Sequence, residues 1–181
     1  MAGIYFERRI KRLKGKNGLF ALCFILSITL GCTKKELAAP GNYFEIENIN
    51  SFVQVLQEYP NGILANRNDK RLRTQIITFQ FAENNRVYFC TNDLKPMYTQ
   101  LKQFPYVSYC TYADEFEPVV SINGKVVFVE DSAVKLRAFE GNEHIRSLYK
   151  TSDNPNLKVF YIDTEEIETF GSDGAKIFKL K

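Results

Sequence analysis

Short β-type runs separated by turn residues dominate this sequence from residue 62 onward. Aromatic and β-branched residues alternate with polar ones in runs such as RTQIITFQF at 73–81 and RVYFCT at 86–91, a pattern typical of strands with one buried face. Helical runs occur only at a few connections. Because a parallel sheet needs a helix at every crossover, the pattern excludes a doubly wound fold and predicts antiparallel strands.

The predicted elements define a mainly β fold with peripheral helices. Strands are expected at 62–67, 73–81, 86–91, 106–112, 117–130, 157–163, 167–171 and 175–180, and helices at 50–59, from Asn92–Asp93 to Gln103, at 131–139 and at 143–149. We expect Asn50 or Ser51 to cap the first helix, and Asn123–Gly124 to mark a bulge or a close backbone approach in the long strand. The arrangement predicted is an antiparallel six- to seven-stranded barrel. Side chains fill the interior of so small a barrel, so a large ligand must bind outside it or between the subunits of a dimer.

Composition and charge narrow the class of protein. Fifteen Phe and ten Tyr against two Met and no Trp favour a β-rich core. Four Cys are too few for a disulfide scaffold. The net charge is +3, but residues 1–31 carry six basic residues and one acid, so the remainder has a net charge of −2. A nucleic-acid-binding domain is therefore not indicated.

The amino-terminal segment has the layout of a signal peptide. Residues 1–17 are basic and residues 18–30 are uncharged, and thirteen residues span only about 20 Å of the roughly 30 Å bilayer core. The run Leu30-Gly31-Cys32 resembles a bacterial lipobox, although Thr29 and Leu30 depart from it. We predict a leader over residues 1–32, lipidated at Cys32, then a linker over 33–42 and one domain over 43–181. This implies membrane attachment in the cell envelope; an uncleaved anchor or a cytoplasmic protein is the alternative.

Familiar catalytic patterns are missing from the sequence. The single His, His144, lies on a short polar helix and is interpreted as a surface residue. Cys90 and Cys110 lie in apolar strands twenty residues apart, which supports buried thiols, or a bridge if their strands are adjacent, but no zinc or other metal site. There is no nucleophile elbow, Walker loop or dinucleotide-binding glycine pattern. Hydrolase and kinase functions are therefore disfavoured.

One polar constellation suits an anion. Arg73 opens a strand, Thr91–Asn92 ends its hairpin partner, and Lys95 lies in the first turn of the next helix. A guanidinium binds phosphate through two parallel donors, and a helix start offers free backbone N–H groups. The plainer interpretation is a solvated strand edge, a cap and a surface charge, and spacing alone leaves both open.

The chain resembles the pyridoxamine 5'-phosphate oxidase-like family over about residues 44–171. The resemblance rests on NGILANR at 61–67, RTQIITF at 73–79, YFCTND at 88–93, the helix LKPMYTQLKQFPYV and the turn NGKVVFVED. It implies a flavin mononucleotide (FMN)-binding split barrel that forms a homodimer, with FMN between the subunits. It places the phosphate at Arg73, Thr91 and Lys95, beside Asn92. The flavin would be bordered by Thr74, Gln75, Ile76 and Cys90.

The chain also departs from the vitamin-processing members of that family. Val119 and Ser121 stand where those oxidases have Gln and Arg, the carboxy-terminal Arg and His are missing, and there is no Trp. Pyridoxamine phosphate is therefore not the expected substrate. The resemblance implies an FMN-dependent oxidoreductase acting on another small acceptor. The alternatives are a flavin- or tetrapyrrole-binding module without turnover, and a lipid-anchored barrel that has lost its cofactor.

Overall fold

The computed structural model describes residues 48–172 and 174–180; the predicted leader with Cys32, the linker and the first residues of the predicted domain lie outside them. The strands are β1 Asn61–Arg67, β2 Leu72–Glu83, β3 Arg86–Asn92, β4 Tyr106–Tyr112, β5 Val119–Val129, β6 Leu157–Gly171 and β7 Gly174–Lys179. The helices are α1 Ile49–Glu58, α2 Pro96–Gln103, α3 Ser132–Glu140 and α4 Glu143–Tyr149, with one 3₁₀ turn, η1, at Asp114–Phe116. None of these helices has both the length and the apolar character needed to cross a bilayer.

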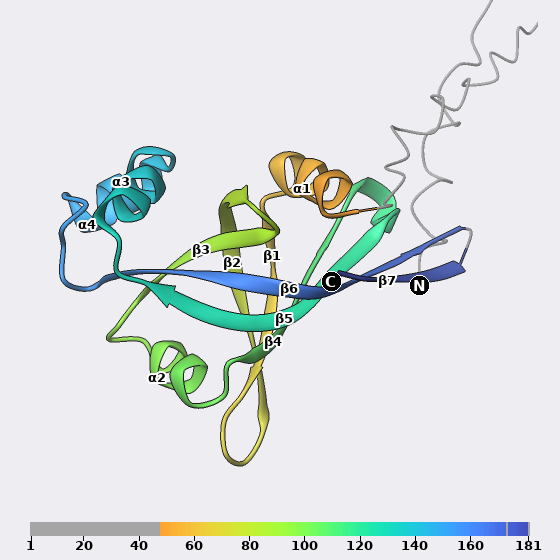
Figure 1. The fold of residues 1–181 in the computed structure, drawn as a ribbon, viewed down its shortest axis with the longest axis horizontal. Helices are drawn as coiled ribbons and strands as arrows, with labels where there is room; N and C mark the ends of the chain where they lie inside the picture. Colours follow the sequence, from red (N-terminus) through yellow and green to blue (C-terminus); the bar gives the residue numbers. More distant parts are fainter. Residues whose placement is uncertain (1–47, 173, 181) are drawn as a thin grey trace, which may run out of the picture. The chain divides into compact units, whose positions relative to one another are not determined.

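The strands form one antiparallel sheet that closes on itself (Figure 1). Their order is β3-β2-β1-β4-β5-β6-β7, and an additional pairing of β3 with β6 closes six strands into a barrel, with β7 added outside it along β6. All seven pairings are antiparallel. The predicted antiparallel barrel with peripheral helices is confirmed.

A single long strand, β6, replaces the two strands predicted at 157–163 and 167–171. The chain stays extended between them because β5 continues to pair with it, from Val129↔Val159 to Val119↔Phe170. The register shifts at Asn123/Gly124, where Glu165 of β6 is the extra residue; the irregularity and the close backbone approach predicted at Gly124 are confirmed, but the extra residue lies on the partner strand. A Cβ on Gly124 would collide with the carbonyl oxygen of Asp163, which is why glycine is required where the two strands bend together.

Two helix starts differ from the sequence prediction. The cap of α1 is Asn48, whose side-chain oxygen accepts from the N–H groups of Asn50 and Ser51; the predicted caps, Asn50 and Ser51, lie inside the helix. The helix predicted from Asn92–Asp93 begins only at Pro96. Asn92 stays in β3 and its side chain accepts from the N–H of Leu94 at 2.8 Å, so a turn held by Asn92 comes before the helix.

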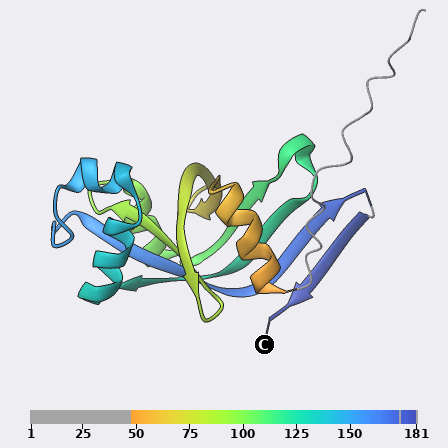
Figure 2. The same ribbon diagram turned by 90° about the horizontal axis from the view of Figure 1, so that it is seen from above.

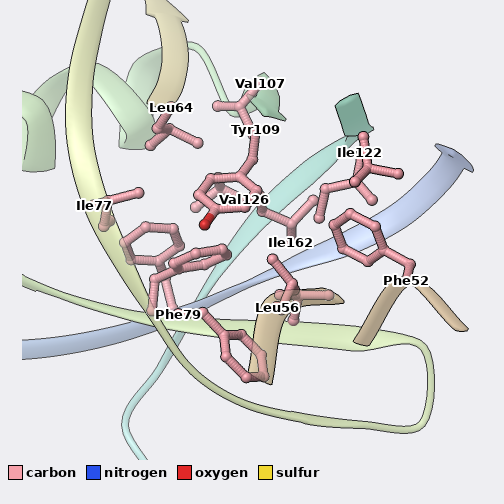
Figure 3. Packing of buried hydrophobic residues seen from close by; sticks show 14 of the residues in the cluster. Phe52, Leu56, Leu64, Ile77, Phe79, Val107, Tyr109, Ile122, Val126 and Ile162 are labelled. Carbon is pink, nitrogen blue, oxygen red and sulfur yellow. The ribbon is translucent and has the colours of Figure 1, made fainter. Parts of the chain in front are cut away.

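Large side chains fill the barrel interior, as Figure 3 shows for part of the cluster. Phe89 stacks with Phe160 at 5.6 Å between ring centroids and lies 4.8 Å from the ring of Tyr109. Helix α1 contributes Phe52, Val55 and Leu56, all fully buried, and it covers one opening of the barrel in the view of Figure 2. The interior is packed with side chains, so a ligand as large as a nucleotide must bind outside it.

Helices α3 and α4 cover the outer surface of β3 and β6 (Figure 1). Cys90 on β3 packs against both helices, in clusters that include Ala138 and Tyr149. Cys110 lies on β4, separated from β3 by β2 and β1 in the sheet order. Both thiols are free, and because their strands are not adjacent, the disulfide that the sequence left open does not form.

Candidate functional site

The barrel splits where β2 and β3 part. Their pairing runs from Glu83↔Arg86 to Phe79↔Phe89 and ends there. In the described part of the chain, the segment 72–78 of β2 then has a strand partner on one side only, namely β1. Alternate residues of this segment therefore present backbone N–H and C=O groups along an open edge. Beyond Phe89, β3 pairs with β6 alone.

Two cations stand at the mouth of this split. Arg73 lies near the start of β2 and Lys95 just before α2, and both side chains are exposed. Arg73 lies six residues before Phe79 on β2, and Lys95 lies six residues after Phe89, past the end of β3. The three ion pairs found among residues 48–172 and 174–180 involve neither of them. Both charges are thus available to an anionic ligand.

The start of α2 faces the same region. Lys95 precedes the helix without a side-chain cap, and Pro96 occupies its first turn. The N–H of Lys95 donates to the carbonyl of Asn92 at 3.0 Å, so the turn fixes where the helix begins. Asn92 was predicted as a binding residue; its side chain instead holds this turn. An uncapped helix start that directly follows Lys95 favours negative charge.

Thr91 lies near the end of β3, on the inward face that also carries Phe89. It is 3% exposed, and its hydroxyl oxygen has no hydrogen-bond partner within the described chain. Its carbonyl accepts from the Tyr149 hydroxyl at 3.2 Å; burial raises the pKa of Tyr149, so that hydroxyl remains a donor. Buried hydroxyls are usually satisfied, and an unsatisfied one at the base of a split marks a place for a ligand or a water.

A chain of three side-chain amides connects β2 to α2 behind the split. Gln75 donates to the side-chain oxygen of Asn66 at 3.0 Å, and Asn66 donates to Gln100 at 3.0 Å. Asn66 is 2% exposed and lies directly opposite Arg73 in the β1–β2 register. The predicted residue Gln75 is therefore held by Asn66, which the sequence analysis missed. The sequence did contain a signal for Asn66, because it occupies the next inward position after Gly62 and Leu64 in the alternating pattern of β1.

The other predicted residues divide between two faces. Thr74 and Ile76 point outward from β2, and Ile76 is 82% exposed. The side chain of Cys90 points under α3 and α4, away from the inward face that carries Thr91, and burial raises its pKa to about 12. Only the backbone of Cys90 lies along the split, and its thiol is neutral and unreactive.

A strip that is mostly apolar, but includes Ser121 and the exposed Glu168, crosses the outer face of the sheet next to the split; we call it the open sheet face. The strand registers place one row of residues along it: Ile76, Ile63, Cys110, Ser121, Glu168 and Ile177. A second row runs through Tyr112, Val119, Phe170 and Ala175. Exposed apolar surface gathered in this way marks an interaction site.

A shallow hollow of about 210 Å³ lies on the open sheet face. Val119, Ser121, Phe170 and Ile177 are among the residues that line it. The two positions that depart from the vitamin-processing oxidases, Val119 and Ser121, thus lie together on the same wall. Their side chains make this wall smaller and less polar than Gln and Arg would.

The described residues provide no cluster of three His, Cys, Asp or Glu side chains that could hold a metal ion. His144 is exposed on α4. Two polar residues that the sequence analysis did not single out, Asp93 and Lys158, lie beside Thr91. Lys158 was detectable in principle, since it occupies an inward position in the alternating run LKVFYI.

No protein-family model matches the sequence and no curated protein matches it, but solved structures do. A NimC/NimA family protein from Clostridium acetobutylicum is similar at TM-score 0.66 and 19% identity, over 77% of this chain and 97% of that one. A pyridoxamine 5'-phosphate oxidase-related, FMN binding protein from Nostoc punctiforme has TM-score 0.61 and 12% identity, over 76% and 93%. A heme binding protein from Mycobacterium smegmatis has TM-score 0.60 and 12% identity, over 75% and 59%.

The chain therefore has the split-barrel fold of the pyridoxamine 5'-phosphate oxidase-like proteins, as its resemblance predicted. At these identities the similarity establishes the fold. One of the three similar proteins is named for FMN and another for heme, so the choice of ligand for this chain depends on its own residues.

Proposed function

We propose that this protein binds FMN in the split between β2 and β3 and uses it for redox chemistry on a small acceptor. The observation that supports this is the combination at the split: an unpaired strand edge, two cations free of ion pairs, and the buried, unpartnered hydroxyl of Thr91. A phosphate needs cations and donors, and a ribityl chain needs backbone donors and acceptors. The residues present fit both needs.

Each side chain has a distinct role in this proposal. Arg73 and Lys95 neutralise the phosphate from the two sides of the split, and the Thr91 hydroxyl donates to it from below. Gln75 donates to Asn66 through its nitrogen, which directs its oxygen elsewhere and leaves it as an acceptor for a ligand hydroxyl or N–H. Bound FMN supplies hydride or electron transfer, and the protein supplies binding, orientation and a pocket for the acceptor.

The open sheet face supports a homodimer in which a second copy covers the ring. Ile76, on the strand that borders the split, is also the most exposed large hydrophobic residue of this face. An apolar strip beside a ligand site remains wet in a monomer, whereas a two-fold contact buries it on both copies and closes the site. The hollow lined by Val119 and Ser121 then lies on the surface that one copy presents to the other.

The first test is an absorbance spectrum of the full chain, purified in mild detergent, incubated with FMN and freed of unbound flavin by gel filtration. Retained flavin bands that are bleached by a reductant support the proposal. Retained colour without turnover of any acceptor supports a binding module instead. A colourless protein supports a barrel that has lost its cofactor and overturns the proposal.

The Arg73→Ala variant tests the location of the site. Loss of a charge-assisted hydrogen bond is expected to weaken FMN binding by roughly 1.5–3 kcal/mol. Arg71→Ala is the matched control, because Arg71 is an exposed arginine two residues away, in the turn that precedes β2. Equal FMN affinity in wild type and Arg73→Ala contradicts the assignment.

We also propose that Cys32 carries a lipid and attaches the domain to the cell envelope through residues 33–42. The support is the leader-like pattern of the sequence alone. Detergent phase partitioning of wild type against Cys32→Ser tests it. Identical partitioning of the two proteins rules the anchor out.

A further inference from the structure

Lys158 lies next to the proposed phosphate site, on the far side of β3. It is directly opposite Thr91 in the β3–β6 register, so the two side chains share one face of the sheet. The neighbouring inward residues of β6, Phe160 and Ile162, are buried in the core. A lysine at the next position of that row is unusual, and its side chain is only 18% exposed.

The polar groups around Lys158 are poorly satisfied. Its ammonium is 3.6 Å from Oδ2 of Asp93, a long separation for an ion pair. The other carboxylate oxygen of Asp93 and the hydroxyl of Thr91 are buried and lack a hydrogen-bond partner within residues 48–172 and 174–180. An ammonium carries three donors, so donors and acceptors lie together here without pairing fully. Native sites rarely leave such groups unpaired unless a ligand or water completes them.

The aromatic neighbour of Lys158 is Tyr98, on α2. The ammonium is 5.9 Å from the centre of that ring, and the ammonium of Lys102 is 5.4 Å from it. The ring packs edge-on against Phe128 at 4.9 Å, which fixes it over the end of the barrel. Lys102 is exposed in the last turn of α2, whereas Lys158 is held inside by its strand. The two lysines therefore share one neighbour and differ in position relative to Thr91.

We propose that Lys158 is a further phosphate-binding residue of this site, reaching past Thr91 from β6. This inference rests on the proposed FMN function. Adjacent strands are about 4.8 Å apart, and a lysine has a flexible four-carbon stem, so its ammonium can serve a ligand held over the neighbouring strand. The site then takes charge from three elements: Arg73 from β2, Lys95 from the start of α2 and Lys158 from β6.

Asp93 has a definite part in this arrangement. Without ligand, it is the counter-ion that holds the ammonium near Thr91. Its backbone N–H donates to the carbonyl of Asn156 at 3.2 Å, which ties the turn before α2 to the start of β6. A phosphate dianion competes with this carboxylate for Lys158. The lysine ammonium can bind the phosphate because its present ion pair with Asp93 is long and incomplete.

The test compares FMN with riboflavin, which lacks the phosphate, on the full-length protein. Dissociation constants are measured by quenching of flavin fluorescence for wild type, Lys158→Gln and Lys102→Gln. Lys102→Gln is the control, because it also removes one positive charge beside the Tyr98 ring. We expect Lys158→Gln to raise the Kd for FMN about tenfold and to leave that for riboflavin unchanged, while Lys102→Gln changes neither.

Several results overturn this inference. It fails if Lys158→Gln weakens the binding of FMN and of riboflavin equally, if Lys102→Gln weakens FMN binding as much as Lys158→Gln does, or if neither variant changes FMN binding. In each of these cases the wild type still binds FMN, so the proposed function stands. Failure of wild type to bind either flavin overturns both proposals together. If Lys158→Gln does not fold, Asp93→Asn decides: removal of the competing carboxylate is expected to tighten FMN binding, and unchanged or weaker binding overturns the inference.

Discussion

The open sheet face allows a direct test of the proposed homodimer, through the substitution Ile76→Asp. Ile76 is 82% exposed on β2 and pairs across the strands with Ile63, which is 47% exposed. Full burial of an isoleucine contributes about 1.5–3 kcal/mol, and a two-fold interface buries it once on each copy. The substitution should therefore cost the proposed dimer about 3–6 kcal/mol, a weakening of roughly a hundred- to ten-thousandfold.

Sedimentation equilibrium of the full chain measures this constant directly. Leu148→Asp is the matched control, because Leu148 is 56% exposed on α4, on the helical layer over β3 and β6 and outside the two rows of the open sheet face. The thermal midpoint of each variant, taken below the dimer dissociation constant, separates folding from association. The reasoning is refuted if Ile76→Asp and Leu148→Asp shift dimerisation equally, or if wild type is a monomer at all accessible concentrations.

Three other variants probe the fold and the site. Thr91→Val removes a buried hydroxyl without a partner. The free energy of unfolding of the apoprotein, measured in urea, should therefore rise by about 1 kcal/mol, while FMN titration should show weaker binding. A lower free energy of unfolding contradicts the assignment. Gly124→Ala forces a Cβ against the carbonyl of Asp163 and should cost about 1–3 kcal/mol in the same assay; Gly141→Ala, with a milder contact, is its control. Burial raises the pKa of Cys90 from 9.0 to about 12, so above pH 9 the unfolded thiol loses its proton first and stability falls with pH. Cys90→Ala should flatten that fall by up to about 1.4 kcal/mol per pH unit, and an unchanged slope refutes it.

Period-two patterning predicted the strands because each strand has one buried face, and the open sheet face follows from the same alternation. The sequence could not show that β6 is continuous, because residues 164–166 are polar and acidic. They stay extended through pairing with β5, about forty residues away, and at Glu166 through pairing with β7. The late start of α2 has a similar cause: Asn92 forms the last pair of β3 with β6, at Leu157, and this tertiary pairing overrides the local helix signal.

In the candidate site, too, some residues could be predicted from local sequence and others depend on contacts with distant parts of the chain. Arg73, Thr91 and Lys95 were predicted from charge and position, since a strand end next to a helix start favours anion binding. Asn66, Asp93 and Lys158 were missed because each is polar within an otherwise apolar or turn-forming run. Their importance depends on neighbours that the sequence does not reveal: Gln100 on α2 for Asn66, and Thr91 across the sheet for Lys158.

The two ends of the proposed FMN site follow different constraints. At the phosphate end, the split in the barrel itself creates the binding geometry, because β2 loses its partner beyond Phe79 and leaves an open edge between two cations. At the ring end, the wall belongs to the open sheet face, where Val119 and Ser121 line a shallow hollow beside Phe170. Most of this lining is apolar, although Lys176 and Glu168 also line the hollow. If the proposed dimer places this hollow over the flavin, its walls favour a small, mostly apolar acceptor.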